Sequence, residues 1–146
     1  MATNTALDTL IELATNETDE AARRLGHAIR ACEDTEQKLA LLLQYRDDYQ
    51  TRFRSGVAAG ISASSYRNFQ LFLDKLDTAI AGQQQIVDDA RKRIVDERGA
   101  WQSSERKRMS YDTLATRAEK EDLRRESRRD QKLMDEFATR QANYKR

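Results

Sequence analysis

Apolar residues recur along the first part of the chain at alternating steps of three and four. This stripe consists of Leu7, Ile11, Ala14, Thr18, Ala21, Leu25, Ala28, Cys32, Thr35, Leu39, Leu42, Arg46, Tyr49 and Phe53. Such a 3.5-residue repeat is typical of a helix in a coiled coil. Thr5 followed by Asp8 has the spacing of a capping box at a helix start. The sequence therefore predicts a helix over about 5–54.

The repeat breaks in a stretch without charged residues. This stretch, over about 55–64, contains Gly56 and Gly60, either of which can adopt the left-handed conformation that closes a helix. Ser62 or Ser64 can cap the helix that follows. We therefore expect the turn between two helices here.

A second repeat with the same spacing follows the turn. Its positions are Phe69, Leu73, Leu76, Ile80, Gln83, Val87, Ala90, Ile94, Glu97 and Trp101. Beyond Trp101 it thins to Tyr111, Leu114, Ala118 and Leu123, and a last apolar group comes at Leu133, Met134, Phe137 and Ala138. The pattern predicts a second helix over about 65–142.

Each predicted helix has one apolar stripe that must be buried, and the nearest available surface is the other stripe. We therefore predict an all-α fold: one domain over 1–146, a long two-stranded antiparallel coiled-coil hairpin. Folding about residue 59 leaves everything after about 118 as a C-terminal helical overhang. At about 1.5 Å per residue the first helix would be roughly 75 Å long. The overhang's apolar group is then either a docking site or a frayed end.

The composition is polar for a folded chain, with 38% apolar and 35% charged residues in 146. Disorder is the alternative for such a composition, and the sustained periodicity favours helices. The formal net charge is only +1. Oppositely charged residues four apart are expected to pair on the outer faces: Asp19–Arg23, Glu20–Arg24, Asp34–Lys38, Asp48–Arg52, Asp88–Lys92 and Asp89–Arg93.

Few residues could support chemistry. There is no glycine-rich phosphate loop, and the single histidine, His27, is expected on the surface. Cys32 falls on the stripe, so we expect a packed, unreactive side chain, and a lone cysteine suits a reducing compartment. We predict no enzyme, cofactor or metal site. No apolar run reaches a membrane span of roughly 18 residues, and the first residues lack the pattern of a signal peptide, so a cytoplasmic protein without membrane insertion is expected.

Aromatic residues crowd both sides of the predicted turn. They are either core residues that close the coiled coil or contacts for a partner: Tyr45, Tyr49, Phe53, Tyr66, Phe69 and Phe72. The basic clusters at 106–108 and 124–129 have acidic neighbours, which favours a solvated helix surface over nucleic-acid binding. An acidic protein surface is the second interpretation of these clusters.

The chain resembles the flagellar FliJ family over essentially its whole length. The most specific similarities are the Tyr45/Tyr49 pair, the Gly60-Ile61 turn and the closing string "DQKLMDEFA" at 130–138. The resemblance implies a coiled-coil stalk protein of the flagellar type III export apparatus, peripheral at the inner membrane. The implied partners are the hexameric export ATPase, the cytoplasmic domain of the export-gate membrane protein, and substrate chaperones.

The resemblance also implies site residues. The export-gate surface falls on Leu42, Tyr45, Tyr49, Phe72, Leu76 and Ala79. By analogy with a rotary stalk, Met134 and Phe137 in the overhang are possible contacts of the ATPase. The alternatives are a virulence-type secretion stalk, a general holdase chaperone, and a coiled coil that binds nucleic acid.

Overall fold

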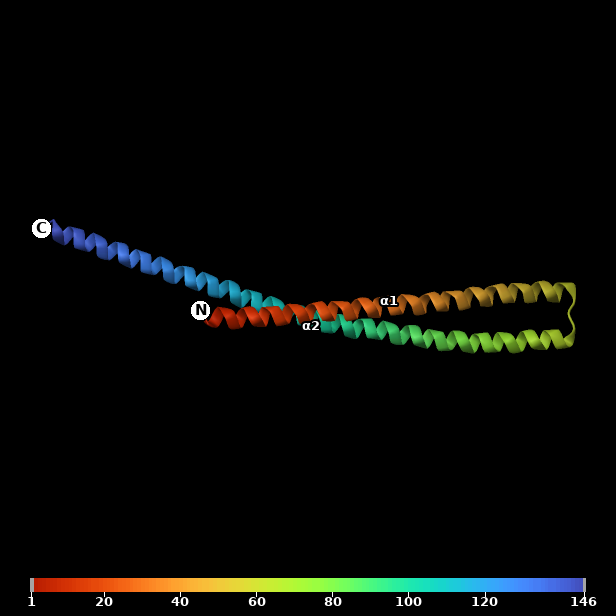
Figure 1. Ribbon diagram of the computed structural model, residues 1–146. Coiled ribbons are helices and arrows are strands. Elements are labelled where there is room, and N and C mark those ends of the chain that lie inside the picture. The colour runs from red at the N-terminus through yellow and green to blue at the C-terminus, as the bar shows by residue number, and fades with distance from the viewer. Residues whose placement is uncertain (1, 146) are drawn as a thin grey trace. The chain divides into compact units, whose positions relative to one another are not determined.

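The computed structural model describes residues 2–145, which form two α-helices and the turn between them (Figure 1). Helix α1 spans Ala2–Ala59 and helix α2 spans Ala63–Tyr144. The described residues contain no strand. The helices pack against each other in antiparallel directions, so the predicted all-α hairpin is confirmed.

The helices are longer at the turn than the sequence pattern indicated. Helix α1 ends at Ala59 instead of near residue 54, and α2 already begins at Ala63. The charge-poor stretch continues the helix because it contains several alanines, the residue with the highest helix propensity. The capping box expected at Thr5 is wrong, because α1 begins at Ala2 and Thr5 lies inside the helix.

Of the candidates for the turn, Gly60 adopts the left-handed conformation and Ser62 caps the second helix. Gly60 has a φ of 87°, in the left-handed region, and its N–H donates to the carbonyl of Val57 at 3.2 Å. Ser62 caps α2, because its Oγ accepts the backbone N–H of Ser65 at 3.2 Å. Its carbonyl accepts the N–H of Tyr66 at 3.0 Å.

The helices divide into two compact units: residues 20–101, and residues 2–19 with 102–145. In the unit 20–101, every predicted stripe position is buried or half-buried, which confirms the seam there. Ala21 and Val87 are fully buried, and Leu76 is 7% exposed. The seam of α1 in this unit is made of small side chains near Ala21 and of aromatic ones near the turn.

A hydrogen bond between side chain and backbone crosses the seam of this unit. The Nε2 of Gln83 donates to the carbonyl of Thr35 at 3.0 Å, and the Thr35 hydroxyl donates to the carbonyl of Cys32 at 2.7 Å. A buried amide needs such a partner, so this bond favours one register of α1 against α2.

In the other unit, Ala14 and Thr18 are buried on α1. The stripe of α2 continues in unbroken steps of three and four through Ser104, Arg108, Tyr111, Ala115 and Ala118, all at least half-buried. The predicted seam positions Leu114 and Leu123 are wrong, because they are 48% and 64% exposed. Leu114 lies one residue from the stripe, and one residue turns a helix by about 100°.

The predicted overhang is confirmed as an uncovered helical segment. Every residue from Glu119 to Lys145 is exposed, although α2 continues to Tyr144. The heptad positions after Ala118 also become charged, beginning with Asp122 and Arg125. A charged stripe has no apolar surface to bury, so the seam ends for a chemical reason as well as for lack of an opposing helix.

The expected pairs of charges four apart on the outer faces are not formed among residues 5–145. Arg24 instead reaches Glu97 on the other helix at 3.4 Å. Several carboxylates accept hydrogen bonds from a glutamine one turn earlier: Gln44 to Asp48, Gln84 to Asp88, and Gln85 to Asp89, at 3.0–3.1 Å. Asp48, Asp88 and Asp89 are therefore paired with amide donors and not with the expected lysine or arginine.

Candidate interaction surfaces

Aromatic rings from both helices meet beside the turn. Tyr49 stands at the centre, with its ring centroid 4.4 Å from that of Phe72 and 4.9 Å from that of Phe69. Tyr45 meets Phe72 edge-on at 6.1 Å and lies 6.5 Å from Tyr49. These separations are within the range in which aromatic pairs attract one another. The cluster thus belongs both to the seam and to one edge of the hairpin.

Residues seven apart lie on the same face of a coiled-coil helix. Tyr45 shares its face with Lys38 and Ala31 on α1, and Phe72 shares its face with Ala79 and Ile86 on α2. The contact between Tyr45 and Phe72 places these two rows at one edge. We call it the aromatic edge: Ala31, Lys38, Tyr45, Phe72, Ala79 and Ile86.

On the opposite edge of the same unit, ion pairs join the two helices. Arg91 Nε lies 3.3 Å from Glu36 Oε1, and Arg46 pairs with Asp77. Glu36 shares its heptad row with Leu43, and Asp77 shares its row with Arg91. We call this the ion-paired edge: Glu36, Leu43, Arg46, Asp77 and Arg91.

The two edges differ in what they offer to a partner. On the aromatic edge, the ion pair between Arg24 and Glu97 lies three heptads before Tyr45, and no ion pair joins the helices between there and the turn in the described chain. Tyr45 is 50% exposed, so half of a large amphipathic ring faces solvent without a charged neighbour across the seam. Half-exposed aromatic side chains of this kind are typical of binding hot spots.

The six residues implied for the export gate are all in this region, at different depths. Ala79 is exposed, and Tyr45 is half exposed. Leu42, Tyr49 and Phe72 are half-buried. Leu76 is 7% exposed, so it can act on a partner mainly by supporting its neighbours. Sequence reasoning missed Ile86, which is 50% exposed and could have been found by its heptad spacing from Phe72 and Ala79.

A second apolar surface lies on the overhang. Met134 and Phe137 are 72% and 63% exposed, as expected for a segment without a partner. Successive steps of three, four or seven residues place further apolar side chains on the same face. We call this face the overhang stripe: Leu123, Leu133, Met134, Phe137 and Tyr144. Glu126 and Asp130 lie between Leu123 and Leu133, and Arg140 lies between Phe137 and Tyr144, so charged residues of both signs interrupt the stripe.

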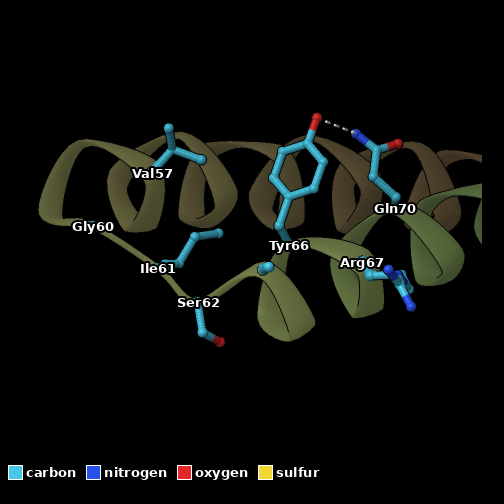
Figure 2. A pocket seen from close by; sticks show the side chains of 8 residues that line it. Val57, Gly60, Ile61, Ser62, Tyr66, Arg67 and Gln70 are labelled. Carbon is cyan, nitrogen blue, oxygen red and sulfur yellow. Dashed lines mark hydrogen bonds between the residues drawn. The ribbon is translucent and has the colours of Figure 1, made fainter.

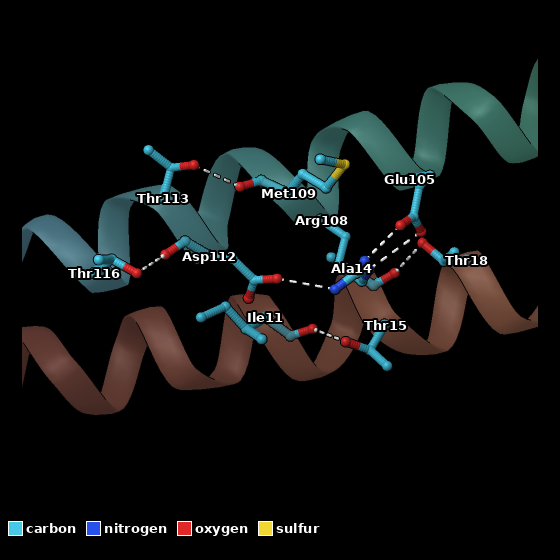
Figure 3. A network of polar contacts seen from close by, with 10 residues as sticks. All are labelled: Ile11, Ala14, Thr15, Thr18, Glu105, Arg108, Met109, Asp112, Thr113 and Thr116. Carbon is cyan, nitrogen blue, oxygen red and sulfur yellow. Dashed lines mark hydrogen bonds and ion pairs between the residues drawn. The ribbon is translucent and has the colours of Figure 1, made fainter.

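A polar network occupies the seam between 2–19 and 102–118 (Figure 3). The Arg108 guanidinium donates to Glu105 at 2.5 and 3.2 Å and to Asp112 at 2.9 Å. The hydrogen bond from Arg108 lowers the pKa of the Glu105 carboxyl, and the same bond raises the pKa of Arg108. The network satisfies its own charges within α2, which indicates a structural role.

The two residues singled out for possible chemistry lie as expected. His27 is exposed, and its Nδ1 accepts a hydrogen bond from Arg30 at 3.0 Å. Cys32 is 3% exposed, and its Sγ donates to Glu36 at 3.4 Å. Burial and the neighbouring carboxylate raise the pKa of the Cys32 thiol, which disfavours the nucleophilic thiolate. Within residues 2–145 no cluster of His, Cys, Asp and Glu has the arrangement of a metal site.

The fold and these surfaces define a class of protein: an antiparallel coiled-coil hairpin with exposed apolar surfaces on one edge and on one end of α2. The sequence profile of the flagellar FliJ protein family matches residues 3–146. The chain belongs to this family. It is 34% identical to the flagellar FliJ protein of Escherichia coli (strain K12) and 33% identical to that of Salmonella typhi. Each match covers 142 residues and 97% of both chains.

Neither helix, within the part of the chain that the structure describes, has an apolar stretch that could span a bilayer.

Proposed function

We propose that this protein is a non-enzymatic coiled-coil component of the flagellar type III export apparatus. In this role it connects the export ATPase ring to the cytoplasmic domain of the export gate and escorts substrate chaperones. The observation that carries the proposal is the chemical asymmetry of the hairpin. Family membership supports a flagellar role. The six residues of the aromatic edge form no ion pair between the helices, which supports a docking role for this edge.

The gate would bind along the aromatic edge. Tyr45 offers a half-exposed ring whose inner side is held by Tyr49 and Phe72. Such a held ring loses little conformational entropy when a partner covers it. Ala79, one heptad after Phe72, leaves room for a partner side chain beside the rings. The contact set is then Leu42, Tyr45, Tyr49, Phe72 and Ala79, with Leu76 beneath them.

The ATPase would bind the overhang stripe. Burying Met134 and Phe137 in a partner removes apolar surface from water, at roughly 25 cal/mol per Å². Glu126, Asp130 and Arg140 add charges of both signs to the same face, so the complementary surface would be apolar with charged residues at its rim. The two proposed contacts lie in different units of the chain, which allows one molecule to hold two partners at once.

The gate contact is tested by titration calorimetry with the purified cytoplasmic domain of the gate. Replacing Tyr45→Ala and Phe72→Ala together is expected to weaken binding by more than about 1 kcal/mol. The matched control is Leu43→Ala on the ion-paired edge, where the side chain is as exposed, at 48%, as Tyr45. An unchanged affinity in the double variant, or an equal loss in the control, contradicts this surface.

The ATPase contact is tested by a second assay, which measures how strongly the protein stimulates the export ATPase. The variants Met134→Ser and Phe137→Ser are expected to reduce stimulation while gate binding stays intact. Stimulation at the level of the unchanged protein would rule out the overhang stripe as the contact. Equal binding to unfolded model proteins and to the gate domain would instead favour a general holdase.

A further inference from the structure

A hollow of about 720 Å³ lies beside the turn of the hairpin (Figure 2). Its walls come from the last turn of α1 at Val57, from the turn Gly60–Ser62, and from the first turns of α2 between Tyr66 and Gln70. We call it the tip hollow. A volume of this size is in the range of pockets that bind small ligands or side chains.

The apolar walls of the tip hollow are exposed but held in place. Val57 is 49% and Tyr66 is 47% exposed. The Tyr66 ring packs on Phe53, with centroids 5.4 Å apart, and its hydroxyl accepts a hydrogen bond from Gln70 at 3.4 Å. Ile61 packs closely over Gly56, where a Cβ would lie 3.3 Å from its Cγ2. These contacts pre-form the hollow, which lowers the entropic cost of binding.

The surroundings of the tip hollow carry one sign of charge. The segment 49–73 contains Arg52, Arg54 and Arg67 and no acidic residue, whereas the whole chain has 26 basic and 25 acidic residues. Arg67 lines the hollow, and Arg54 lines the depression that adjoins it. Neither arginine has an ion-pair partner within residues 5–145.

The carboxylates nearest to the tip hollow already have basic neighbours outside it. Asp74 and Asp77 line the adjoining depression together with Arg46 and Arg54, and Asp77 is bonded to Arg46. They do not line the tip hollow. An incoming carboxylate therefore meets Arg67 without a competing acid in the hollow, and a charge-assisted, bidentate bond is available to it.

We propose that the tip hollow binds an acidic segment of a partner protein. In this complex an apolar side chain of the segment inserts between Val57 and Tyr66, and a flanking carboxylate pairs with Arg67. The charge of the hollow and its apolar walls each select one half of this ligand. Three arginines are fewer than the four to eight basic residues typical of anionic-lipid recognition, and a hollow receives a side chain better than a flat bilayer does.

This site is separate from the proposed gate surface. Gln70 lines both the tip hollow and the depression that contains Arg46 and Asp77 of the ion-paired edge. The tip hollow therefore opens on the side away from the aromatic edge. The full chain can bind an acidic segment here and a second partner along Tyr45 and Phe72 at the same time.

The test begins with a phage library of random dodecapeptides selected on the full-length protein. Enrichment of peptides in which an apolar residue is flanked by Asp or Glu is expected. A fluorescein-labelled peptide of the most enriched sequence is then titrated by fluorescence anisotropy. Arg67→Glu is expected to weaken it at least tenfold, because roughly that much follows from losing one charge-assisted bond. Val57→Ser is expected to weaken it several-fold, with helicity unchanged.

Two controls separate this site from its alternatives. Arg98→Glu changes an exposed arginine of α2 outside the hollow, and affinity should not change. The Tyr45→Ala and Phe72→Ala pair should also leave peptide affinity unchanged, whatever happens to gate binding. The proposal is overturned by a selection without acidic sequences or by equal affinity in Arg67→Glu. Arg67-dependent binding to phosphatidylserine vesicles without peptide binding would overturn it in favour of a membrane.

Discussion

The two units of the hairpin have the same period but different seams. In residues 20–101 the seam positions carry Ala21, Leu76 and Val87, all buried, and aromatic rings near the turn. In residues 2–19 with 102–145 the same positions carry Thr18, Ser104 and Arg108, and from Asp122 to Glu136 all of them are charged. A repeat of 3.5 residues therefore sets where a helix can pack, and the side chains at those positions set how strongly it packs.

This difference predicts that residues 20–101 form a more stable, firm part of the hairpin and that residues 2–19 with 102–145 form a less stable, soft part. Buried apolar area contributes stability in proportion to the area removed from water, so the unit 20–101 should hold most of it. The exposed segment 119–145 adds no stability from apolar area buried against the other helix. Local stability is expected to fall along α2 from the turn toward its C-terminal end.

The largest expected effect comes from a charge in the firm seam. Val87→Asp places a carboxylate at a fully buried position, and we expect it to lower the free energy of unfolding by at least about 3 kcal/mol. Val95→Asp is the matched control in the same helix, at a position 66% exposed, with an expected change within about 0.5 kcal/mol. Urea unfolding followed by circular dichroism measures both. Similar losses in the two variants would contradict the seam described for 20–101.

A smaller effect is expected when low pH protonates Glu105 in the seam between 2–19 and 102–118. The pKa of Glu105 is lowered by Arg108, so its stabilising contribution is present above the ordinary carboxyl pKa of 4.5. That contribution is lost as pH falls through the lowered value in the folded protein. Glu105→Gln removes this pH dependence, so its melting temperature should fall less steeply below pH 4.5 than that of the unchanged protein.

Glu121→Gln is the control for the acid experiment. Glu121 lies 3.9 Å from Arg125 in the exposed overhang, where ion pairs contribute little. Thermal melts over a pH series should be the same for this variant and the unchanged protein. If Glu105→Gln and Glu121→Gln behave alike, the Arg108 network adds no measurable stability to this part of the hairpin.

The smallest expected effect is in the overhang. Leu133→Ala is expected to change unfolding by less than about 0.5 kcal/mol, because the side chain is 64% exposed. The same substitution at Leu76, which is 7% exposed, should cost about 2–5 kcal/mol. Denaturant melts of both variants give the comparison. A large loss at Leu133 would mean that the overhang stripe is covered, for example by a second copy of the chain.

Much of the fold could be predicted from periodicity because a coiled coil is built from local spacing. Every seam position predicted between Ala21 and Trp101 is buried or half-buried. Two predictions fail because composition is a weaker guide than the repeat: the charge-poor residues before Gly60 continue α1, and Leu114 is exposed one residue away from the stripe. The repeat itself, followed without regard to side-chain type, leads to Ala115 and Arg108.

The candidate sites were less accessible from the sequence. The aromatic residues near the turn were recognisable, but periodicity alone left open whether they form core or contact. Helix pairing answered this in part, because Tyr49 and Phe72 are half-buried while Tyr45 remains half exposed. The tip hollow had no signal of its own, since Val57, Tyr66 and Arg67 come together only when the turn at Gly60 closes.

The two helices, their facing stripes, the turn and the uncovered end follow from the amino-acid sequence, because each depends on spacing within a few residues. The packing of the helices, in contrast, is needed to see which edge is joined by Glu36–Arg91 and Arg46–Asp77 and which edge leaves Tyr45 half exposed. Those pairings join residues far apart in the chain, and their formation depends on the rotation and register of one helix against the other.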